Sequence, residues 1–138
     1  MNENDIGFLV KRLADKIKSS VDASLKDEGL TFSQTLVIGF LSERGGKATQ
    51  KEIEDHLQVS HPTVVGIISR LEKNGFVVFS FDEKDRSNKI VCDTDKALNT
   101  TDSMIIGKQK MEQSLTKGLS EAELAELRRI INLMYENI

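Results

Sequence analysis

The sequence predicts a mainly α-helical domain of six helices that carries one small antiparallel β-hairpin of two or three strands, and three adjacent segments support this fold class. A short helix is expected to start at Thr49, and a second one over Ser60–Gly75 follows within a few residues of its end. Two β-branched and aromatic runs, residues 76–81 and 90–92, then flank a polar, turn-rich stretch at residues 82–89. Two closely spaced helices followed at once by a hairpin with a charged tip form a winged helix-turn-helix.

The residue types of the second helix mark both of its ends and two different faces. Ser60 suits the N-cap, Pro62 suits the first turn, and Gly75 suits the left-handed position after the last turn. One apolar stripe at helical spacing consists of Val64, Ile67, Ile68 and Leu71. The opposite face is mostly small or cationic and consists of Pro62, Val65, Gly66, Ser69, Arg70 and Lys73. This second face is suited to close approach by a partner.

Three capping boxes and two long periodic segments predict the remaining helices. The boxes, in which two side chains satisfy backbone donors reciprocally, are Thr31 with Gln34, Thr49 with Glu52, and Ser120 with Glu123. Apolar residues every three or four positions predict long helices over about residues 6–25 and 95–115, the latter capped by Thr94 or Asp93. The helix after Ser120 has apolar residues in alternating steps of three and four, which is typical of a seam between helices.

The length and composition of the chain fit one ordinary globular domain. The chain has 138 residues, of which 30% are charged and 38% hydrophobic, and its formal net charge is −3. No apolar run approaches the roughly 18 residues that a membrane helix needs, and the acidic N-terminus is unlike a signal peptide. We therefore expect a cytoplasmic protein without a membrane partner. The single cysteine, Cys92, agrees with a reducing compartment.

The charge distribution gives only weak support for nucleic-acid binding, because phosphate neutralisation normally requires a clear basic surplus. Residues 44–94 hold eight basic and eight acidic residues, and the flanking parts are slightly acidic. These numbers argue against an indiscriminate nucleic-acid binder.

The two ends of the chain predict a homodimer. Residues 1–30 and 95–138 carry strong apolar stripes outside the predicted winged helix of residues 31–94, and one small lobe does not obviously cover both stripes. A second copy would cover them, and a twofold dimer would place the two helices that follow Ser60 about 34 Å apart, one turn of duplex DNA. Residues 1–138 are thus expected to form one domain, with residues 31–94 as its winged-helix lobe and the two ends as dimerisation helices. The alternative is that the two terminal helices pack on each other within one chain.

The order and spacing of these segments resemble the MarR family of bacterial transcription regulators. The resemblance covers nearly the whole chain and is carried by Gly29-Leu30-Thr31 with Gln34, by Ser60-x-x-Thr63-Val64, and by Arg70-Leu71-Glu72-Lys73-x-Gly75-Phe76-Val77. It implies a homodimer on pseudo-palindromic double-stranded DNA, with the helix after Ser60 in the major groove and the hairpin, or wing, at the adjacent minor groove. It also implies that a small effector, such as an aromatic acid, or an oxidant can release the DNA.

The resemblance leaves the register of the wing open. Counting back from Thr94 places Ser87 where the family has an arginine, whereas matching residues 86–89 makes Arg86 that residue and requires one extra residue in the second strand. We favour Arg86. Asp93 also stands where an apolar residue is usual, and Ala97 stands where glycine is common.

The predicted DNA contacts fall on the helix after Ser60 and on the wing. Hydroxyl, methyl and cationic side chains of the helix can reach phosphates or base edges, and a basic wing tip suits a minor groove. The predicted contacts are Ser60, His61, Pro62, Thr63, Val65, Ser69, Arg70, Lys73, Lys84, Arg86 and Lys89. Alternatives remain for two of them, since Arg70 can pair locally near Glu72 and Pro62 can serve only the first turn. The charged tip can likewise be no more than a solvated turn.

The two histidines and the cysteine do not form a convincing metal or redox site. His56 and His61 lie five residues apart and lack a third and a fourth ligand, so neither a metal nor another cofactor is expected. His56 is expected to face solvent or to pack at the bend between the two helices. Cys92 is expected to be a small core residue, with redox sensing as the alternative because Lys89 lies nearby.

Together these features favour a sequence-specific, DNA-binding regulator, and a repressor in particular because blocking a promoter needs no further domain. The alternative is a winged-helix module for protein association, which the balanced charge of residues 44–94 permits. An enzyme is not expected, because the sequence shows no nucleophile with a base, no metal set and no glycine-rich phosphate loop.

Overall fold

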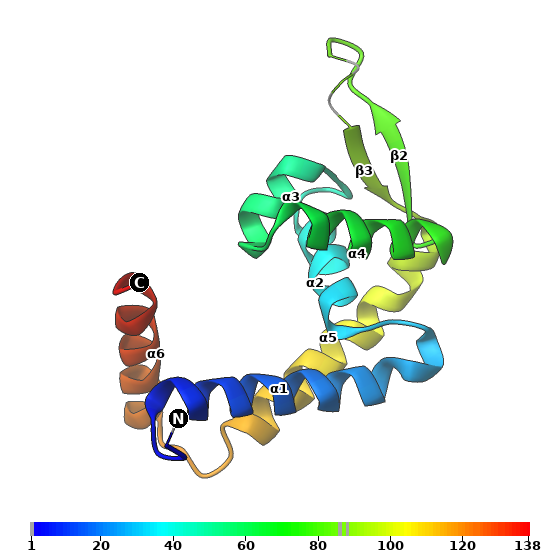
Figure 1. Cartoon of the computed structure of the whole chain (residues 1–138). Helices are drawn as coiled ribbons and strands as arrows, with labels where there is room; N and C mark the ends of the chain where they lie inside the picture. Colours follow the sequence, from blue (N-terminus) through cyan, green and yellow to red (C-terminus); the bar gives the residue numbers. More distant parts are fainter. Residues whose placement is uncertain (1, 86, 88) are drawn as a thin grey trace. The chain divides into compact units, whose positions relative to one another are not determined.

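The structure, a computed structural model, describes residues 2–85, 87 and 89–138, and within them it holds six α-helices, one 3₁₀ turn and three short strands (Figure 1). The elements are α1 (Ile6–Leu25), η1 (Lys26–Glu28), α2 (Phe32–Glu43), β1 (Lys47–Thr49), α3 (Gln50–Leu57), α4 (His61–Lys73), β2 (Val77–Phe81), β3 (Lys89–Asp93), α5 (Asp95–Leu115) and α6 (Glu121–Glu136). The chain divides into two compact units, Met1–Ile106 and Gly107–Ile138, and the division falls inside α5.

The helices begin at the capping residues that the sequence predicts. All three capping boxes form, and in the first of them Thr31 Oγ1 accepts the backbone N–H of Gln34 at 3.3 Å. Ser60 caps α4, and Gly75 takes the left-handed φ of +81° just beyond the end of that helix. Of the two candidate caps for α5, Thr94 is the one whose hydroxyl accepts a backbone N–H from the first turn, that of Ala97 at 3.4 Å. The mainly helical fold class is therefore confirmed.

The three strands form one antiparallel sheet in the order β1-β3-β2. Strand β3 lies in the middle, and its Val91 pairs with Ala48 of β1 on one side and with Phe79 of β2 on the other. The sequence predicts the hairpin but does not place the third strand, because β1 has only three residues and its partner lies more than 40 residues away. Strands β2 and β3 extend away from α4 (Figure 1), and their last described pair is Phe81 with Lys89.

The core of the first unit lies beneath α4 and positions that helix. The apolar stripe of α4 is buried, with Val64 and Leu71 at 0% exposure. It packs with buried side chains from the neighbouring helices and strands, namely Val37, Ile38, Leu41, Ile53, Phe76, Val77 and Val91. Because this stripe points inward, the small and cationic face of α4 points outward, as the helical spacing predicts.

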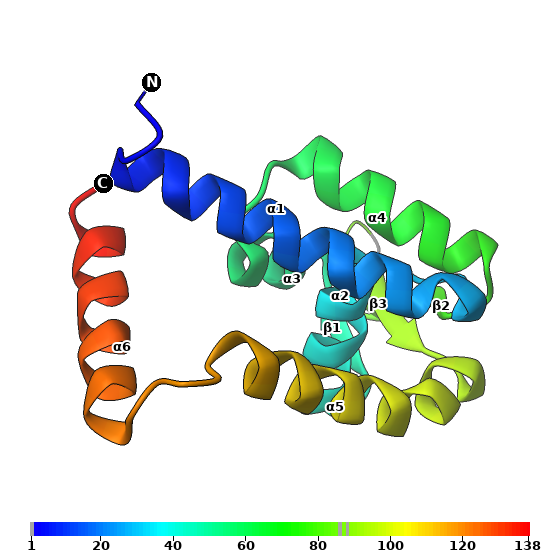
Figure 2. The same cartoon turned by 90° about the horizontal axis from the view of Figure 1, so that it is seen from below.

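Both terminal helices carry exposed apolar side chains. Helix α1 packs against α2, which it crosses in the view of Figure 2, yet several of its apolar residues near the N-terminus are exposed. These residues are Ile6, Leu9, Val10 and Leu13. In the second unit, α6 exposes Leu127, Ile130, Ile131, Leu133 and Tyr135. None of the described helices is both long and apolar enough to cross a membrane.

Candidate nucleic-acid interface

A tight turn between α3 and α4 fixes the relation of the two helices. Gln58 ends α3 in the left-handed conformation, with φ of +55°, which is uncommon for a residue other than glycine. Its backbone N–H donates to the carbonyl of Glu54 at 2.9 Å, and its side-chain amide donates to the carbonyl of Asp55 at 2.6 Å. Two residues later Ser60 starts α4, so the turn holds the N-terminus of α4 beside α3.

The outward face of α4 is exposed and has room for a partner. The predicted contacts on this helix are all exposed, namely His61, Pro62, Thr63, Val65, Ser69, Arg70 and Lys73. A Cβ placed on Gly66, which lies among them, would meet no other atom within 4 Å. Packing inside the chain therefore does not require glycine at this position, and Gly66 borders a cavity between α1, α2 and α4 that Pro62 and Thr63 also line.

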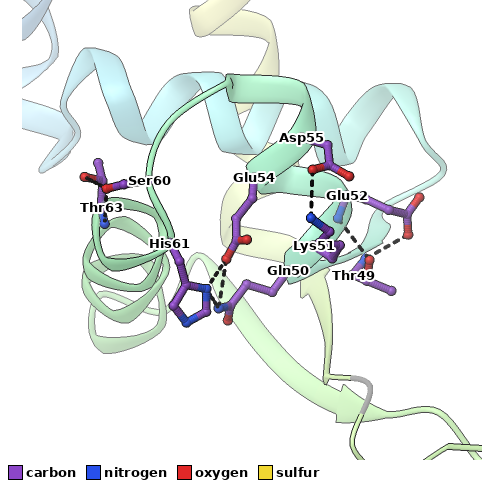
Figure 3. A network of polar contacts seen from close by, with 9 residues as sticks. All are labelled: Thr49, Gln50, Lys51, Glu52, Glu54, Asp55, Ser60, His61 and Thr63. Atoms are coloured by element: carbon purple, nitrogen blue, oxygen red, sulfur yellow. Dashed lines mark hydrogen bonds and ion pairs between the residues drawn. The ribbon is translucent and has the colours of Figure 1, made fainter.

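The N-terminus of α4 is polar, and its side chains contact one another or side chains of α3. Ser60 Oγ accepts the backbone N–H of Thr63 at 3.4 Å and lies 2.8 Å from the hydroxyl of the same residue. His61 contacts Glu54 and Gln50, two residues of α3 that the sequence did not single out (Figure 3). The structure therefore brings Ser60, His61 and Thr63 together at one exposed end of α4.

Arg70 and Lys73 are exposed cations on the last turns of α4. The predicted alternative for Arg70, a local pair near Glu72, has no counterpart among the ion pairs of the described residues. Arg70 instead borders a cavity of about 420 Å³ between α1, α2 and α4. The same cavity is lined by Lys18 and by Asp22, whose Oδ1 accepts the backbone N–H of Phe32 at 2.6 Å.

The wing supplies two further predicted cations. Lys84 lies in the tip, where its backbone N–H donates to Asp82 Oδ1 at 3.0 Å, and hydrogen bonds from Ser87 hold the pKa of Asp85 below its usual range. Lys89 is the first residue of β3, next to the tip, and its Nζ lies 3.5 Å from the ring centroid of Phe79. Arg86, the favoured minor-groove residue, lies outside the described residues, so the predicted wing register stays a prediction.

Comparisons with known proteins identify the family. The model of the MarR family matches residues 28–86. YwoH of Bacillus subtilis, an uncharacterized helix-turn-helix transcriptional regulator, is 33% identical over 106 residues, which are 77% of this chain and 76% of that protein. This chain belongs to the MarR family of transcriptional regulators. BadR of Rhodopseudomonas palustris, a transcriptional activatory protein, is 32% identical over 91 residues, 64% of this chain but only 51% of BadR.

Solved structures of transcriptional regulators share the fold of this chain. The transcriptional regulator SlyA has a TM-score of 0.90 at 26% identity, and the alignment covers 97% of this chain and 94% of that one. The MepR–DNA complex of S. aureus has a TM-score of 0.91 at 24% identity, covering 97% and 98%. BpsR of Bordetella bronchiseptica, whose DNA binding is regulated by 6-hydroxynicotinic acid, has a TM-score of 0.83 at 23% identity, covering 94% and 98%. Because the last two identities are below 25%, these two likenesses show the fold alone.

The remaining candidate residues of this MarR chain are His56 and Cys92. His56 is exposed but stacks on Phe40, with ring centroids 4.2 Å apart and ring planes inclined by 7°. The prediction that Cys92 is a core residue is wrong: it is half-buried in β3, because successive residues of a strand face opposite sides and Val91 takes the buried side. Its Sγ lies 3.7 Å from Ser80 Oγ. In the part of the chain that the structure describes, no three His, Cys, Asp or Glu side chains are grouped as metal ligands.

Sequence reasoning missed three residues at this interface, and all three act across elements. Gln50 and Glu54 reach from α3 to the first residue of α4, and Phe79 lies beneath the ammonium group of Lys89. No sequence pattern separates Glu54 from the other acidic residues of α3, because its contact depends on the angle between two helices. The contact of Phe79 had a weak sequence signal, because an aromatic residue in one strand often contacts side chains on the same face of the neighbouring strand.

Proposed function

We propose that this chain is a sequence-specific DNA-binding regulator, with α4 as the recognition helix and the wing at an adjacent groove. The main support is the outward face of α4, where the side chains are small or cationic and a Cβ on Gly66 would meet no other atom within 4 Å. The apolar stripe on the other side of the helix is buried. An α-helix with such a face fits the major groove of B-form DNA. The same fold is found in MepR bound to DNA. As a regulator of transcription, the protein would act in the compartment that holds the genome.

The proposed active form is a homodimer made by the terminal helices. Exposed apolar side chains occur on α1 and, in the second unit, on α6, where Ile131 is 53% exposed. Exposed apolar stripes of this length favour association, and a twofold axis would place two α4 helices on successive turns of the duplex. A palindromic binding site is the expected counterpart of that symmetry.

Repression is the favoured direction of regulation. A dimer that covers a promoter blocks the polymerase without any further domain, so the fold alone is sufficient for it. BadR is a transcriptional activatory protein, and a site upstream of the promoter rather than over it would point to activation here as well. Footprinting on the DNA next to the gene distinguishes the two directions.

An anionic small molecule is the favoured effector, and the cavity bordered by Arg70 is its candidate site. Lys18 and Arg70 supply two cations there, while Asp22 is engaged with the backbone of α2. A ligand held by Arg70 would compete with DNA for the same side chain. BpsR responds to an aromatic acid, which supports this class of ligand. Thermal stabilisation by aromatic acids that is lost in Lys18→Ala would agree with the proposal.

Selection from random DNA duplexes, followed by anisotropy titrations at several salt concentrations, tests DNA binding. We expect a palindrome with an affinity that falls steeply with salt. Arg70→Ala and Lys84→Ala should each weaken binding about tenfold, and Lys84→Ala should reduce the salt slope by about one. Lys11→Ala is the matched control, because Lys11 pairs with Asp15 on α1. Weak binding without sequence preference or salt dependence would instead favour a protein-association module.

A further inference from the structure

His61, the first residue of α4, is held by two side chains of α3 (Figure 3). Its Nδ1 contacts Glu54 Oε1, and Gln50 Nε2 lies 3.4 Å from that oxygen and 3.5 Å from the ring nitrogen. The side chain of Glu54 is only 15% exposed, whereas that of His61 is 66% exposed. The largely buried carboxylate of Glu54 therefore holds one edge of the His61 ring, and the other edge of the ring faces solvent.

The chemistry of these groups fixes where the ring proton lies. An ionised carboxylate can only accept hydrogen bonds, so the contact with Glu54 requires a proton on Nδ1 of His61. The amide of Gln50 can donate to the same carboxylate and so adds a second donor to it. In a neutral imidazole one nitrogen donates and the other accepts, and a protonated Nδ1 leaves Nε2 as an acceptor.

The second nitrogen of His61 lies on the side of the ring away from Glu54 (Figure 3). Within the described residues it has no hydrogen-bond partner. It belongs to the first residue of α4, whose side chain is 66% exposed. In the major groove a lone acceptor pairs with the amino groups of adenine N6 or cytosine N4, whereas phosphates and guanine offer only acceptors there.

We propose that Glu54 is a positioning residue that holds His61 in the Nδ1-protonated tautomer, so that Nε2 accepts a hydrogen bond from a base amino group. His61 thereby becomes a specificity-determining residue for adenine or cytosine at one position of each half-site. The inference rests on the proposed DNA-binding function and deepens it. The tautomer itself is a property of the free protein and is measured without DNA.

Nitrogen NMR of the free protein at pH 8, where imidazoles are ordinarily neutral, tests the positioning step. The chain has only two histidines, so His56→Gln assigns the spectrum. We expect His61 to carry its proton on Nδ1 in the parent and to lose this preference in Glu54→Ala. Glu54→Gln should retain it because an amide oxygen also accepts. The matched control is Asp55→Ala, which removes the same charge one residue away and breaks only the pair with Lys51.

A parent ring protonated on Nε2, or a tautomer that Glu54→Ala leaves unchanged, overturns the positioning role. The second arm is selection from random duplexes with the parent, Glu54→Ala, Asp55→Ala and His61→Ala. We expect the parent to prefer adenine or cytosine at one position of each half-site. That preference should fall about three- to tenfold in Glu54→Ala and His61→Ala and should persist in Asp55→Ala.

The two alanine variants on α3 lose the same negative charge, so a change in overall affinity that both share is electrostatic. Equal weakening on every sequence in Glu54→Ala would assign His61 to a phosphate and would overturn the base contact. If the parent selects no DNA sequence, the proposed function fails and the base contact fails with it. The NMR measurement then still decides whether Glu54 sets the tautomer.

Discussion

Helices α4 and α6 have the same pattern but different surroundings. Each begins at a serine cap and carries an apolar stripe at helical spacing. In α4 the stripe is covered by the chain itself, with Leu71 at 0% exposure, whereas in α6 Leu127 and Ile131 are 40% and 53% exposed. An amphipathic pattern thus shows that a face needs cover, but it does not show what covers it.

This difference separates two kinds of surface. Because the apolar stripe of α4 is already buried within the chain, the outer face of the helix is not needed for packing and can contact a ligand such as DNA. The exposed stripe of α6 is where a second copy is proposed to pack. Substitutions in the apolar stripe of α4 should therefore unfold the chain, whereas substitutions in the apolar stripe of α6 should dissociate the proposed dimer.

The largest effect is expected from Leu71→Ala. Leu71 is fully buried, and the cavity left in the core should lower the free energy of unfolding by about 2–5 kcal/mol. Urea denaturation measures this loss, and the fraction that remains folded should keep its state of association. Val65→Ala, on the exposed side of the same helix, should change the free energy by less than about 0.5 kcal/mol. Equal losses for the two variants would contradict the assignment of the two faces.

Ile131→Asp should separate folding from association. A charge placed in an apolar interface should raise the dimer dissociation constant about 100-fold, while the circular dichroism of the folded chain stays nearly unchanged. Sedimentation equilibrium at micromolar concentration gives the mass. Asn132→Asp adds the same charge at the next residue and should leave the dimer intact. A parent that sediments as a monomer would remove the homodimer from the proposal.

Gly66→Ala should increase stability and decrease DNA binding together. A Cβ fits without contacts inside the chain, and replacing a helical glycine should stabilise α4 by about 0.5–1 kcal/mol. The same methyl group would occupy the space through which DNA approaches, and affinity should fall about tenfold. Gly39→Ala in α2, where a Cβ also meets nothing within 4 Å, should give the stability without the loss of affinity. Unchanged affinity in Gly66→Ala would mean that this face does not meet DNA closely.

Local chemistry made most of the fold predictable from the sequence. Each capping box joins residues three apart, so Thr31, Thr49 and Ser120 mark helix starts without knowledge of the rest of the chain. The buried stripe of α4 follows in the same way from helical periodicity. These interactions are short in sequence, so helix starts and helix faces can be predicted locally, whereas what covers a face cannot, as the exposed stripe of α6 shows.

What the sequence could not supply depends on contacts between distant segments. Strand β1 exists because Ala48 meets Val91, and His61 is oriented because the turn at Gln58 places it against Glu54. Neither contact has a local signature. The DNA contacts on α4 were predicted from residue types at helical spacing and from the family resemblance, and neither ranks His61 above its neighbours.

Asp93 is a further residue whose surroundings come from distant segments, and it should give the smallest effect. Its backbone pairs with Val77, and its Oδ1 would lie 2.6 Å from a Cβ on Gly46, so the carboxylate lies close against the turn after α2. Burial raises the pKa of Asp93, whereas hydrogen bonds from the backbone and side chain of Ser120 lower the pKa of Glu123 in α6. Replacing each carboxylate by a neutral amide at pH 7 should therefore change the free energy of unfolding in opposite directions.

An acid with a raised folded-state pKa destabilises the fold when it is ionised, so Asp93→Asn should raise the free energy of unfolding at pH 7 by less than about 1 kcal/mol. Near pH 3, below the ordinary pKa of aspartate, this gain should disappear. Glu123→Gln should instead lower the free energy of unfolding at pH 7. This difference from the parent should also vanish as the pH falls through the lowered pKa of Glu123. Urea unfolding at both pH values measures the two differences. A stability loss in Asp93→Asn at pH 7 would mean that the ionised carboxylate is stabilised where it lies, and that burial is not what governs it.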